Sequence, residues 1–193
     1  MTKSSVDIHD SIHSIFLYRL ERDFFRRFIL IILGIDPGLA IIGYGILHAT
    51  GNSFRVLSYG IIETYKEQRL TERLQLIYEG MTQLIEKYSP DEMAIEELFF
   101  NKNAKTAITV GQARGVEILA AVHHQIPVYE YTPLQAKQAV VGYGRAEKIQ
   151  IQESVKLLLN LKEIPKPDDA ADALAIALCH GFSLRFKDQF LMK

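Results

Sequence analysis

Two carboxylates end apolar runs in this chain, and that pattern constrains the fold more than any other feature. Asp36 and Glu96 each follow a short apolar run that is typical of a buried strand. Carboxylates are rarely buried without a partner. Asp169 and Asp172 are three residues apart, so they would share one face of a helix. We therefore expect these acids to meet where the predicted elements end.

Carboxylate oxygens from separate elements are the ligands that Mg²⁺ prefers in proteins. Two such ions about 3.5–4 Å apart hold the attacking and leaving oxygens of an in-line phosphoryl displacement. The acids therefore predict a two-magnesium site for phosphoryl chemistry. The histidines have no partner at metal-ligand spacing, so we assign them no metal.

Each acid also has a simpler interpretation. Asp36 precedes Pro37-Gly38 and could serve only as a turn residue. The same Asp-x-Gly pattern occurs in phosphate loops of sugar-kinase and actin-like ATPases, but this chain has no room for their second domain. We assign Asp168 to the cap of the last helix, where acids favour the positive end. Glu96 and Glu97 face opposite sides of a strand, and the pattern does not decide which of them enters the site.

Composition excludes few classes of protein. The 193 residues are 48% hydrophobic and 23% charged with a net charge of −1, as in an ordinary soluble globular domain. A nucleic-acid ligand would therefore require basic residues that are segregated from the acids. Cys179 is the single cysteine, so an internal disulfide is excluded, and no neighbouring cation in the sequence activates its thiol.

The run from Phe28 to Leu47 follows two arginines and has the hydropathy of a signal peptide or membrane span. Asp36-Pro37-Gly38 interrupts it, and a central Asp costs about 2.5–3.5 kcal/mol on insertion scales. The apolar piece before Asp36 is also far shorter than the roughly 20 residues of a spanning helix. We therefore expect two strands joined by a turn, no membrane segment, and a cytoplasmic protein.

Periodicity predicts a three-stranded meander followed by alternating helices and strands. Strands are expected over Ile31–Ile35, Ile41–Leu47, Phe54–Ile62, Met93–Ile95 and Val128–Tyr131. Helices are expected over Arg69–Tyr88, from Asn103 to about His124, after a capping box at Thr132, over Ala146–Leu159, and from Asp168 to about His180. This order indicates an α/β fold in which a mixed sheet is flanked by helices.

Basic residues gather between Lys102 and Lys148, around the glycine-containing loop Gly142–Arg145. Such a loop suits contact with a phosphate backbone, although a solvated surface explains most lysines. An aromatic pair, Phe99-Phe100, comes soon after the second strand-end acid. Packing in the core is the usual role of phenylalanine, and stacking on an unpaired base is the more specific alternative.

Together these segments resemble the RuvC-type crossover junction endodeoxyribonucleases, the bacterial Holliday-junction resolvases. The resemblance covers Ile31 to about Gly181. It rests on short motifs that are weak singly and highly specific in this order and spacing. They are Leu33–Gly38, Ala94–Glu96 with Phe99, Lys102–Ala104, Gly111–Val116, Lys137–Gly142, Ala146–Lys148 and Asp169–Ala175.

The resemblance implies a ribonuclease H-like fold, a homodimer and Mg²⁺ as cofactor, with two ions per site and Mn²⁺ as a substitute. It places the catalytic, metal-binding acids at Asp36, Glu96, Asp169 and Asp172, and so favours Glu96 over Glu97. It also places the functional lysines at Lys137 and Lys148 and the base-stacking aromatic at Phe99. The basic cluster adds Lys102 and Arg145 as DNA contacts.

We therefore expect a Mg²⁺-dependent, structure-selective endonuclease that resolves four-way DNA junctions by paired symmetric nicks in recombination and repair. Its products would carry 5′-phosphate and 3′-hydroxyl ends, and the RuvA–RuvB branch-migration complex is the implied partner. Two alternatives stay open. One is another ribonuclease H-like nuclease, such as one that cuts RNA–DNA hybrids. The other is a catalytically idle junction-binding protein.

The expected domain organisation has three parts. Residues 1–29 form an N-terminal extension of unknown role, residues 30–185 form the nuclease domain, and residues 186–193 form a C-terminal tail. The extension has no counterpart in the family. It is either an amphipathic docking helix or sequence upstream of the native start.

Overall fold

A mixed sheet forms the centre of the molecule. The computed structural model describes residues 29–98 and 104–192, and within them the strand order is β3-β2-β1-β4-β5. The strands are β1 (Ile29–Asp36), β2 (Ile41–Thr50), β3 (Ser53–Glu63), β4 (Glu92–Glu96) and β5 (Val128–Tyr131). The first three are antiparallel neighbours, whereas β1, β4 and β5 run parallel.

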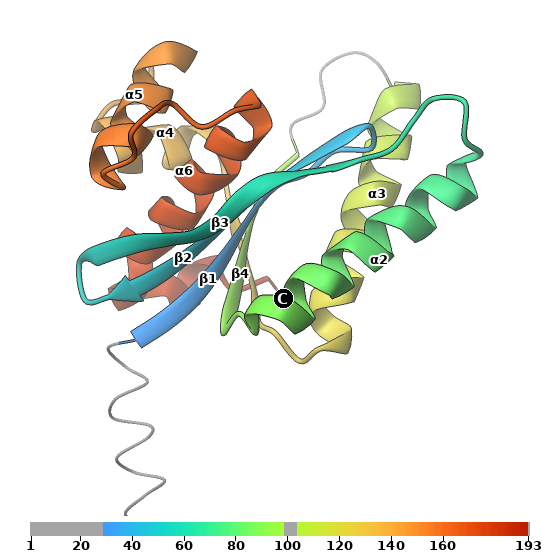
Figure 1. Cartoon of the computed structure of the whole chain (residues 1–193), viewed down its shortest axis with the longest axis horizontal. Coiled ribbons are helices and arrows are strands. Elements are labelled where there is room, and N and C mark those ends of the chain that lie inside the picture. The colour runs from blue at the N-terminus through green and yellow to red at the C-terminus, as the bar shows by residue number, and fades with distance from the viewer. Residues whose placement is uncertain (1–28, 99–103, 193) are drawn as a thin grey trace, which may run out of the picture.

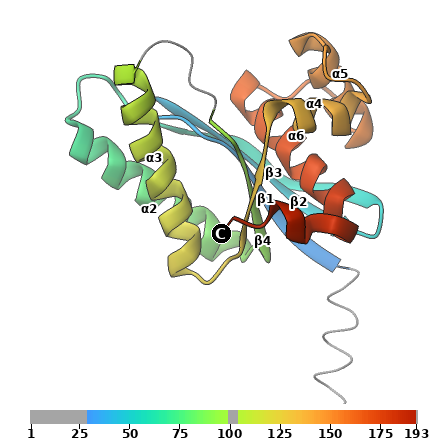
Figure 2. The same ribbon diagram turned by 180° about the vertical axis from the view of Figure 1, so that it is seen from behind.

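Helices cover both faces of this sheet. They are α2 (Leu70–Tyr88), α3 (Ala104–His123), α4 (Pro133–Val141), α5 (Lys148–Leu158) and α6 (Asp168–Ser183), followed by the 3₁₀ helix η1 (Leu184–Phe190). Figures 1 and 2 show α2 and α3 on one face and α6, with α4 and α5 beside it, on the other. The predicted α/β architecture is therefore confirmed.

Local sequence explains where the elements begin. The capping box at Thr132 forms as predicted: the Thr132 hydroxyl accepts from the Gln135 amide at 3.1 Å, and Gln135 Oε1 accepts from the Thr132 amide at 2.8 Å. Four of the five predicted strands extend by one to three residues at one or both ends, β5 has the predicted bounds, and α5 begins at Lys148 rather than at Ala146. The predicted cap role of Asp168 is wrong, because Pro167 occupies the N-cap position of α6 and Asp168 is its first helical residue.

Alternation along β1 supplies two separate cores. Leu33 and Ile35 pack into the core under α2 and α3, whereas Ile32 packs into the core formed with α5 and α6. Side chains of a strand alternate between the faces of a sheet. Asp36 therefore lies on the same face of β1 as Ile32 and Gly34, which is the face that α6 covers.

Helix α6 lies unusually close to the strands beneath it. A Cβ added at Gly34 would collide with the Ala173 carbonyl oxygen, and one added at Gly43 would collide with that of Asp169. Every residue from Ala170 to Gly181 except Asp172 is buried. A helix that is apolar on nearly all sides belongs in an interior. Glycines in β1 and β2 thus let the α6 backbone rest directly on the sheet.

The C-terminal segment packs against the edge of the sheet. The Phe190 and Tyr131 rings lie 4.7 Å apart between centroids, and Leu191 forms a bridge with Tyr129 of β5.

Cys179 is buried in α6, where burial raises the pKa of its thiol to about 12 and leaves it inert. In the described part of the chain, no helix has the length and apolar character needed to cross a bilayer.

The glycine contact can be tested by adding one methyl group. Gly43→Ala should lower the free energy of unfolding by about 1–3 kcal/mol, because the new Cβ overlaps the α6 backbone. Gly111→Ala in α3 is the matched control, since its Cβ meets nothing within 4 Å. That variant should be neutral or gain up to about 1 kcal/mol from helix propensity. Equal urea midpoints for Gly43→Ala and wild type would contradict the close contact.

Candidate functional site

The two strand-end carboxylates lie just beyond the last residue pair that joins β1 to β4. Parallel pairing between these strands ends at Ile35 and Ile95, one residue before each acid. Ala94 packs into the core on the α6 side of β4, so Glu96, two residues later, points to the same side. Glu96 and Asp36 accordingly line the same hollow.

Helix α6 adds the other two acids. Asp169 lies over Gly43, the register partner of Asp36 in β2. Asp172, one helical turn later, lines the same hollow as Asp36 and Glu96. This hollow has a volume of about 240 Å³ and lies at the carboxyl ends of β1 and β4. Three elements far apart in sequence therefore deliver carboxylates to one place.

Crowding of these acids disturbs their ionisation. Burial, followed by the charges of Glu96, Asp172 and Asp169, raises the pKa of Asp36 to about 8. Burial and the Asp172 charge raise the pKa of Glu96 to about 7. Burial also raises the pKa of Asp172, although Lys148 opposes that shift. The cluster is therefore short of positive charge.

Two of the predicted lysines lie at this hollow. Lys148 Nζ is 3.3 Å from Asp172 Oδ2 and 3.2 Å from Asp168 Oδ2. Lys137 lines the hollow, and its charge acts to lower the pKa of Glu96. Asp168, which does not act as the predicted cap, instead holds Lys148 beside the acids.

The other predicted DNA contacts do not line the hollow or lie outside the described residues. Arg145 is exposed in the connection between α4 and α5 and does not line the hollow. Phe99 and Lys102 lie outside the residues that the structure describes.

The donor set fits hard divalent cations. Carboxylate oxygens with raised pKa values gain most from a nearby positive charge. Among the described residues, no group of three His, Cys, Asp or Glu forms a ready-made metal shell. The ammonium group of Lys148 supplies part of the positive charge that a cation would bring, through its contact with Asp172. Cation binding would therefore require small movements of the side chains and release of Lys148 from Asp172.

Sequence reasoning missed charged residues on the opposite face of the sheet. Arg114 of α3 donates through Nε to the Glu96 carbonyl oxygen at 3.1 Å and pairs with Glu130. Glu117 of α3 is fully buried. The glycine-rich segment around Arg114 was singled out in the sequence, but its spacing carries no signal for a contact with β4.

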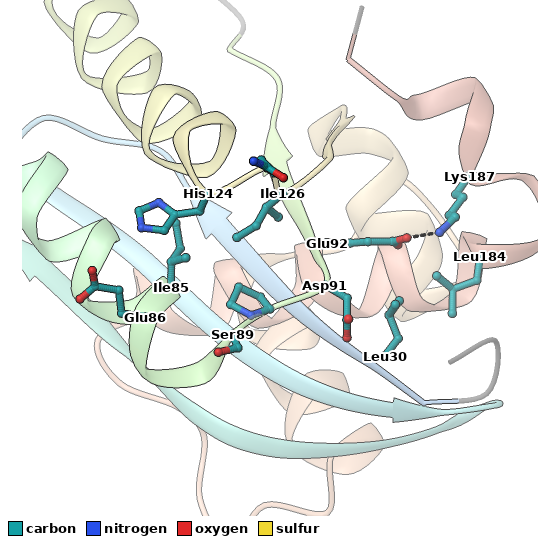
Figure 3. A pocket seen from close by; sticks show the side chains of 12 residues that line it. Leu30, Ile85, Glu86, Ser89, Asp91, Glu92, His124, Ile126, Leu184 and Lys187 are labelled. Carbon is teal, nitrogen blue, oxygen red and sulfur yellow. Dashed lines mark hydrogen bonds and ion pairs between the residues drawn. The ribbon is translucent and has the colours of Figure 1, made fainter. Parts of the chain in front are cut away.

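A larger cavity of about 940 Å³ lies at the opposite end of the sheet, near the starts of β1 and β4 (Figure 3). Several of its charged groups already have partners within the protein. Glu92 pairs with Lys187 and contacts His180 Nε2 at 2.7 Å, and Asp91 Oδ2 accepts from the Ile31 amide at 2.9 Å. Ligands of open α/β sheets bind at the carboxyl ends of the strands. The smaller hollow is therefore the better candidate.

This sheet order, with carboxylates gathered at the ends of β1 and β4 and the start of α6, defines a ribonuclease H-like, divalent-metal-dependent nuclease. The family model described as crossover junction endodeoxyribonuclease RuvC matches residues 32–180. The chain belongs to this RuvC family.

Individual relatives agree with that assignment. The crossover junction endodeoxyribonuclease RuvC of Alkaliphilus oremlandii (strain OhILAs) is 58% identical over 164 residues, which cover 85% of this chain and 100% of the relative. That of Halothermothrix orenii is 60% identical over 156 residues, covering 81% and 94% respectively. The structure of T. thermophilus RuvC in complex with Holliday junction substrate is 35% identical with a TM-score of 0.74, and the match covers 81% of this chain and 95% of that one.

The raised pKa values predict how metal-free stability depends on pH. A carboxyl whose pKa is raised in the folded state stabilises the fold fully below its unfolded pKa, about 4, and this stabilisation is lost as pH rises through the folded value. For Asp36 the folded value is about 8. When a chelator keeps divalent cations away, the melting temperature of wild type should therefore fall relative to that of Asp36→Asn as pH rises from about 5 to about 8.

Thermal unfolding in EDTA across this range checks the sign, and the comparison with Asp36→Asn removes the contribution of other groups such as Glu117. Added Mg²⁺ should raise the melting temperature of wild type more at high pH than at low pH. A wild type that gains stability with pH relative to Asp36→Asn would contradict the crowded-carboxylate description.

Proposed function

We propose that this chain resolves four-way DNA junctions by paired symmetric nicks in recombination and repair, leaving 5′-phosphate and 3′-hydroxyl ends. One observation carries the proposal: carboxylates from β1, β4 and α6 share a hollow with Lys137 and Lys148 in a chain of the RuvC family. The T. thermophilus relative, at 35% identity, has been solved with Holliday junction substrate.

In this proposal Asp36, Glu96, Asp169 and Asp172 hold two Mg²⁺ ions, with Mn²⁺ as a substitute. When bound, the ions would activate a water for in-line attack on the scissile phosphate and neutralise charge on the leaving 3′ oxygen. The raised pKa values of Asp36 and Glu96 support the assignment, because a cation relieves the repulsion that raises them. Asp169 is supported by its place over Gly43.

The lysines would hold the DNA. Lys148 is paired with Asp168 and Asp172. A cation at Asp172 would free Lys148 to contact a phosphate near the scissile bond, and Lys137 would do so from α4. Arg145, exposed on the neighbouring loop, extends this basic edge. Phe99 and Lys102 complete the proposed set of DNA contacts, with Phe99 stacking on a base.

A homodimer built on α3 would present two such sites. Five of the exposed residues of α3 recur at alternating spacings of four and three, the spacing of a helix–helix seam: Ile108, Gln112, Gly115, Leu119 and Val122. Ile108 and Val122 are 64% and 55% exposed. By contrast, Ala113, Ala120 and Ala121 are buried in the protomer's own core. A two-fold dimer matches the approximate two-fold symmetry of a four-way junction.

The remaining assignments follow the same proposal. Residues 30–185 form the nuclease domain, residues 1–29 are an extension, and residues 186–193 are a tail, with Phe190 and Leu191 packed on the body. The partner is the RuvA–RuvB branch-migration complex and the location is the cytoplasm. A panel of four-way junction, duplex and RNA–DNA hybrid separates junction resolution from a hybrid-cutting nuclease and from an idle binding protein.

Substitution of the acids should separate cleavage from binding. Asp172→Asn, and likewise Asp36→Asn, Glu96→Gln or Asp169→Asn, should reduce junction cleavage by at least about a hundredfold, because each removes a ligand of the cations. Junction binding in Ca²⁺ should persist, since it rests on the basic residues. Asp168→Asn removes a carboxylate outside the proposed ligand set and should keep substantial activity, although it also removes one contact of Lys148. Full cleavage by Asp172→Asn would remove that residue from the ligand set.

The dimer surface should be sensitive to a charge. Leu119→Asp should shift sedimentation toward the monomer at micromolar concentration and suppress paired nicking, because the charge would be buried in the seam. Leu157→Asp on α5, where the native side chain is 77% exposed, is the control and should leave association unchanged. A mixed dimer of wild type with Asp36→Asn should nick one strand and release no linear product. A monomeric species with undiminished paired cleavage would refute the dimer.

A further inference from the structure

The end of β4 is held from the face of the sheet opposite α6. Arg114 of α3 donates through Nε to the Glu96 carbonyl oxygen at 3.1 Å. The same guanidinium pairs through Nη2 with Glu130 of β5. The Arg114 side chain is 14% exposed and that of Glu130 33% exposed. This pair is therefore largely withdrawn from water, where geometry is held more firmly than in a surface ion pair.

Glu96 lies where its strand loses one of its two neighbours. Pairing of β4 with β1 ends at Ile95, whereas β5 still pairs with Glu96 and accepts from the Glu97 amide at the Tyr131 carbonyl oxygen at 2.8 Å. Arg114 holds the carbonyl oxygen of that same Glu96–Glu97 peptide. The carboxylate of Glu96 points to the α6 face, whereas Arg114 grips the backbone of the same residue from the α3 face. A rotation of the Glu96 peptide would redirect the carboxylate, and the Arg114 contact opposes that rotation.

Glu117 makes Arg114 harder to replace. It lies three residues after Arg114, on the same side of α3, and it is fully buried. Neither carboxylate oxygen has a hydrogen-bond partner of good geometry among the described residues. Burial raises the pKa of Glu117 to about 8, and the Gly38 amide and the Arg114 charge act against that rise. Arg114 thus compensates two carboxylates, Glu117 and Glu130, behind the site.

We infer that Arg114, anchored by Glu130, is a positioning residue that sets the direction of the Glu96 carboxylate and thereby the affinity of the site for divalent cations. The inference rests on the proposed metal site. Contacts that orient a metal ligand typically change metal affinity by about 10–100-fold when they are removed. Arg114→Lys is the sharpest variant, because it keeps the positive charge and loses the planar Nε donor.

Calorimetric titration of DNA-free protein with Mn²⁺ and Mg²⁺ tests the inference without a cleavage assay. Arg114→Lys should bind each ion about tenfold more weakly than wild type. Glu130→Gln, which keeps Arg114 but loosens its anchor, should shift affinity in the same direction. The double variant should be less than additive, since both changes act through one contact. Arg69→Lys is the matched control, because Arg69 pairs with Glu72 on α2, away from the hollow.

Hydrogen exchange of the metal-free proteins gives a second readout. The segment Glu92–Leu98 should exchange faster in Arg114→Lys, while α6 keeps wild-type protection. Unchanged cation affinity in both variants, with wild type binding normally, would overturn the inference and leave the metal site intact. A uniform loss of protection and melting temperature, with cation affinity preserved, would reduce Arg114 to a structural role. A wild type that binds neither ion would instead overturn the proposed metal site.

Discussion

The close approach of α6 to β1 and β2 is the constraint on which the rest of this structure depends. Gly34 and Gly43 remove the side chains that would otherwise keep the helix away from the strands. The helix therefore lies with its backbone on the sheet, and its apolar residues are buried on nearly all sides. That position brings Asp169 and Asp172 level with the end of β1. A helix held a side chain's thickness further out would not bring its acids to Asp36.

The carboxylates that meet in the resulting site repel one another. Asp36, Glu96 and Asp172 share a partly buried hollow, and their mutual repulsion adds to the cost of burial. A proton, a lysine and a divalent cation are three ways to relieve it. Lys148 offsets part of the negative charge at Asp172, and the charge of Lys137 acts to lower the pKa of Glu96. The fold thus tolerates a locally unfavourable charge arrangement that a cation makes favourable, as functional sites often do.

Periodicity in the sequence predicted the strands and helices, because alternation and helical spacing report burial directly. The strand-end acids were also visible, since a carboxylate that closes an apolar run is unusual. The choice between Glu96 and Glu97 could not come from the pattern; it depends on which face of β4 meets α6, and so on pairing across the sheet. The predicted cap at Asp168 was wrong because Pro167 takes that position and Lys148, twenty residues upstream, pairs with the acid. Arg114 was missed for the same reason, since its partners Glu96 and Glu130 are distant in sequence. The resemblance supplied residue roles that no local pattern encodes.

Helix α3 carries a consequence for how two copies would work together. Arg114, whose guanidinium holds Glu96, is followed directly by Gly115, which is open to solvent at the middle of the exposed seam. In a dimer that meets along this seam, consecutive residues of one rigid helix would touch the neighbouring copy and the catalytic strand. A small slide or tilt between the copies would then be passed to the carboxylate of each active site without any moving loop. Through such a link, DNA binding by one copy would alter the position of the catalytic carboxylate in both copies. This would favour two simultaneous incisions over a single nick.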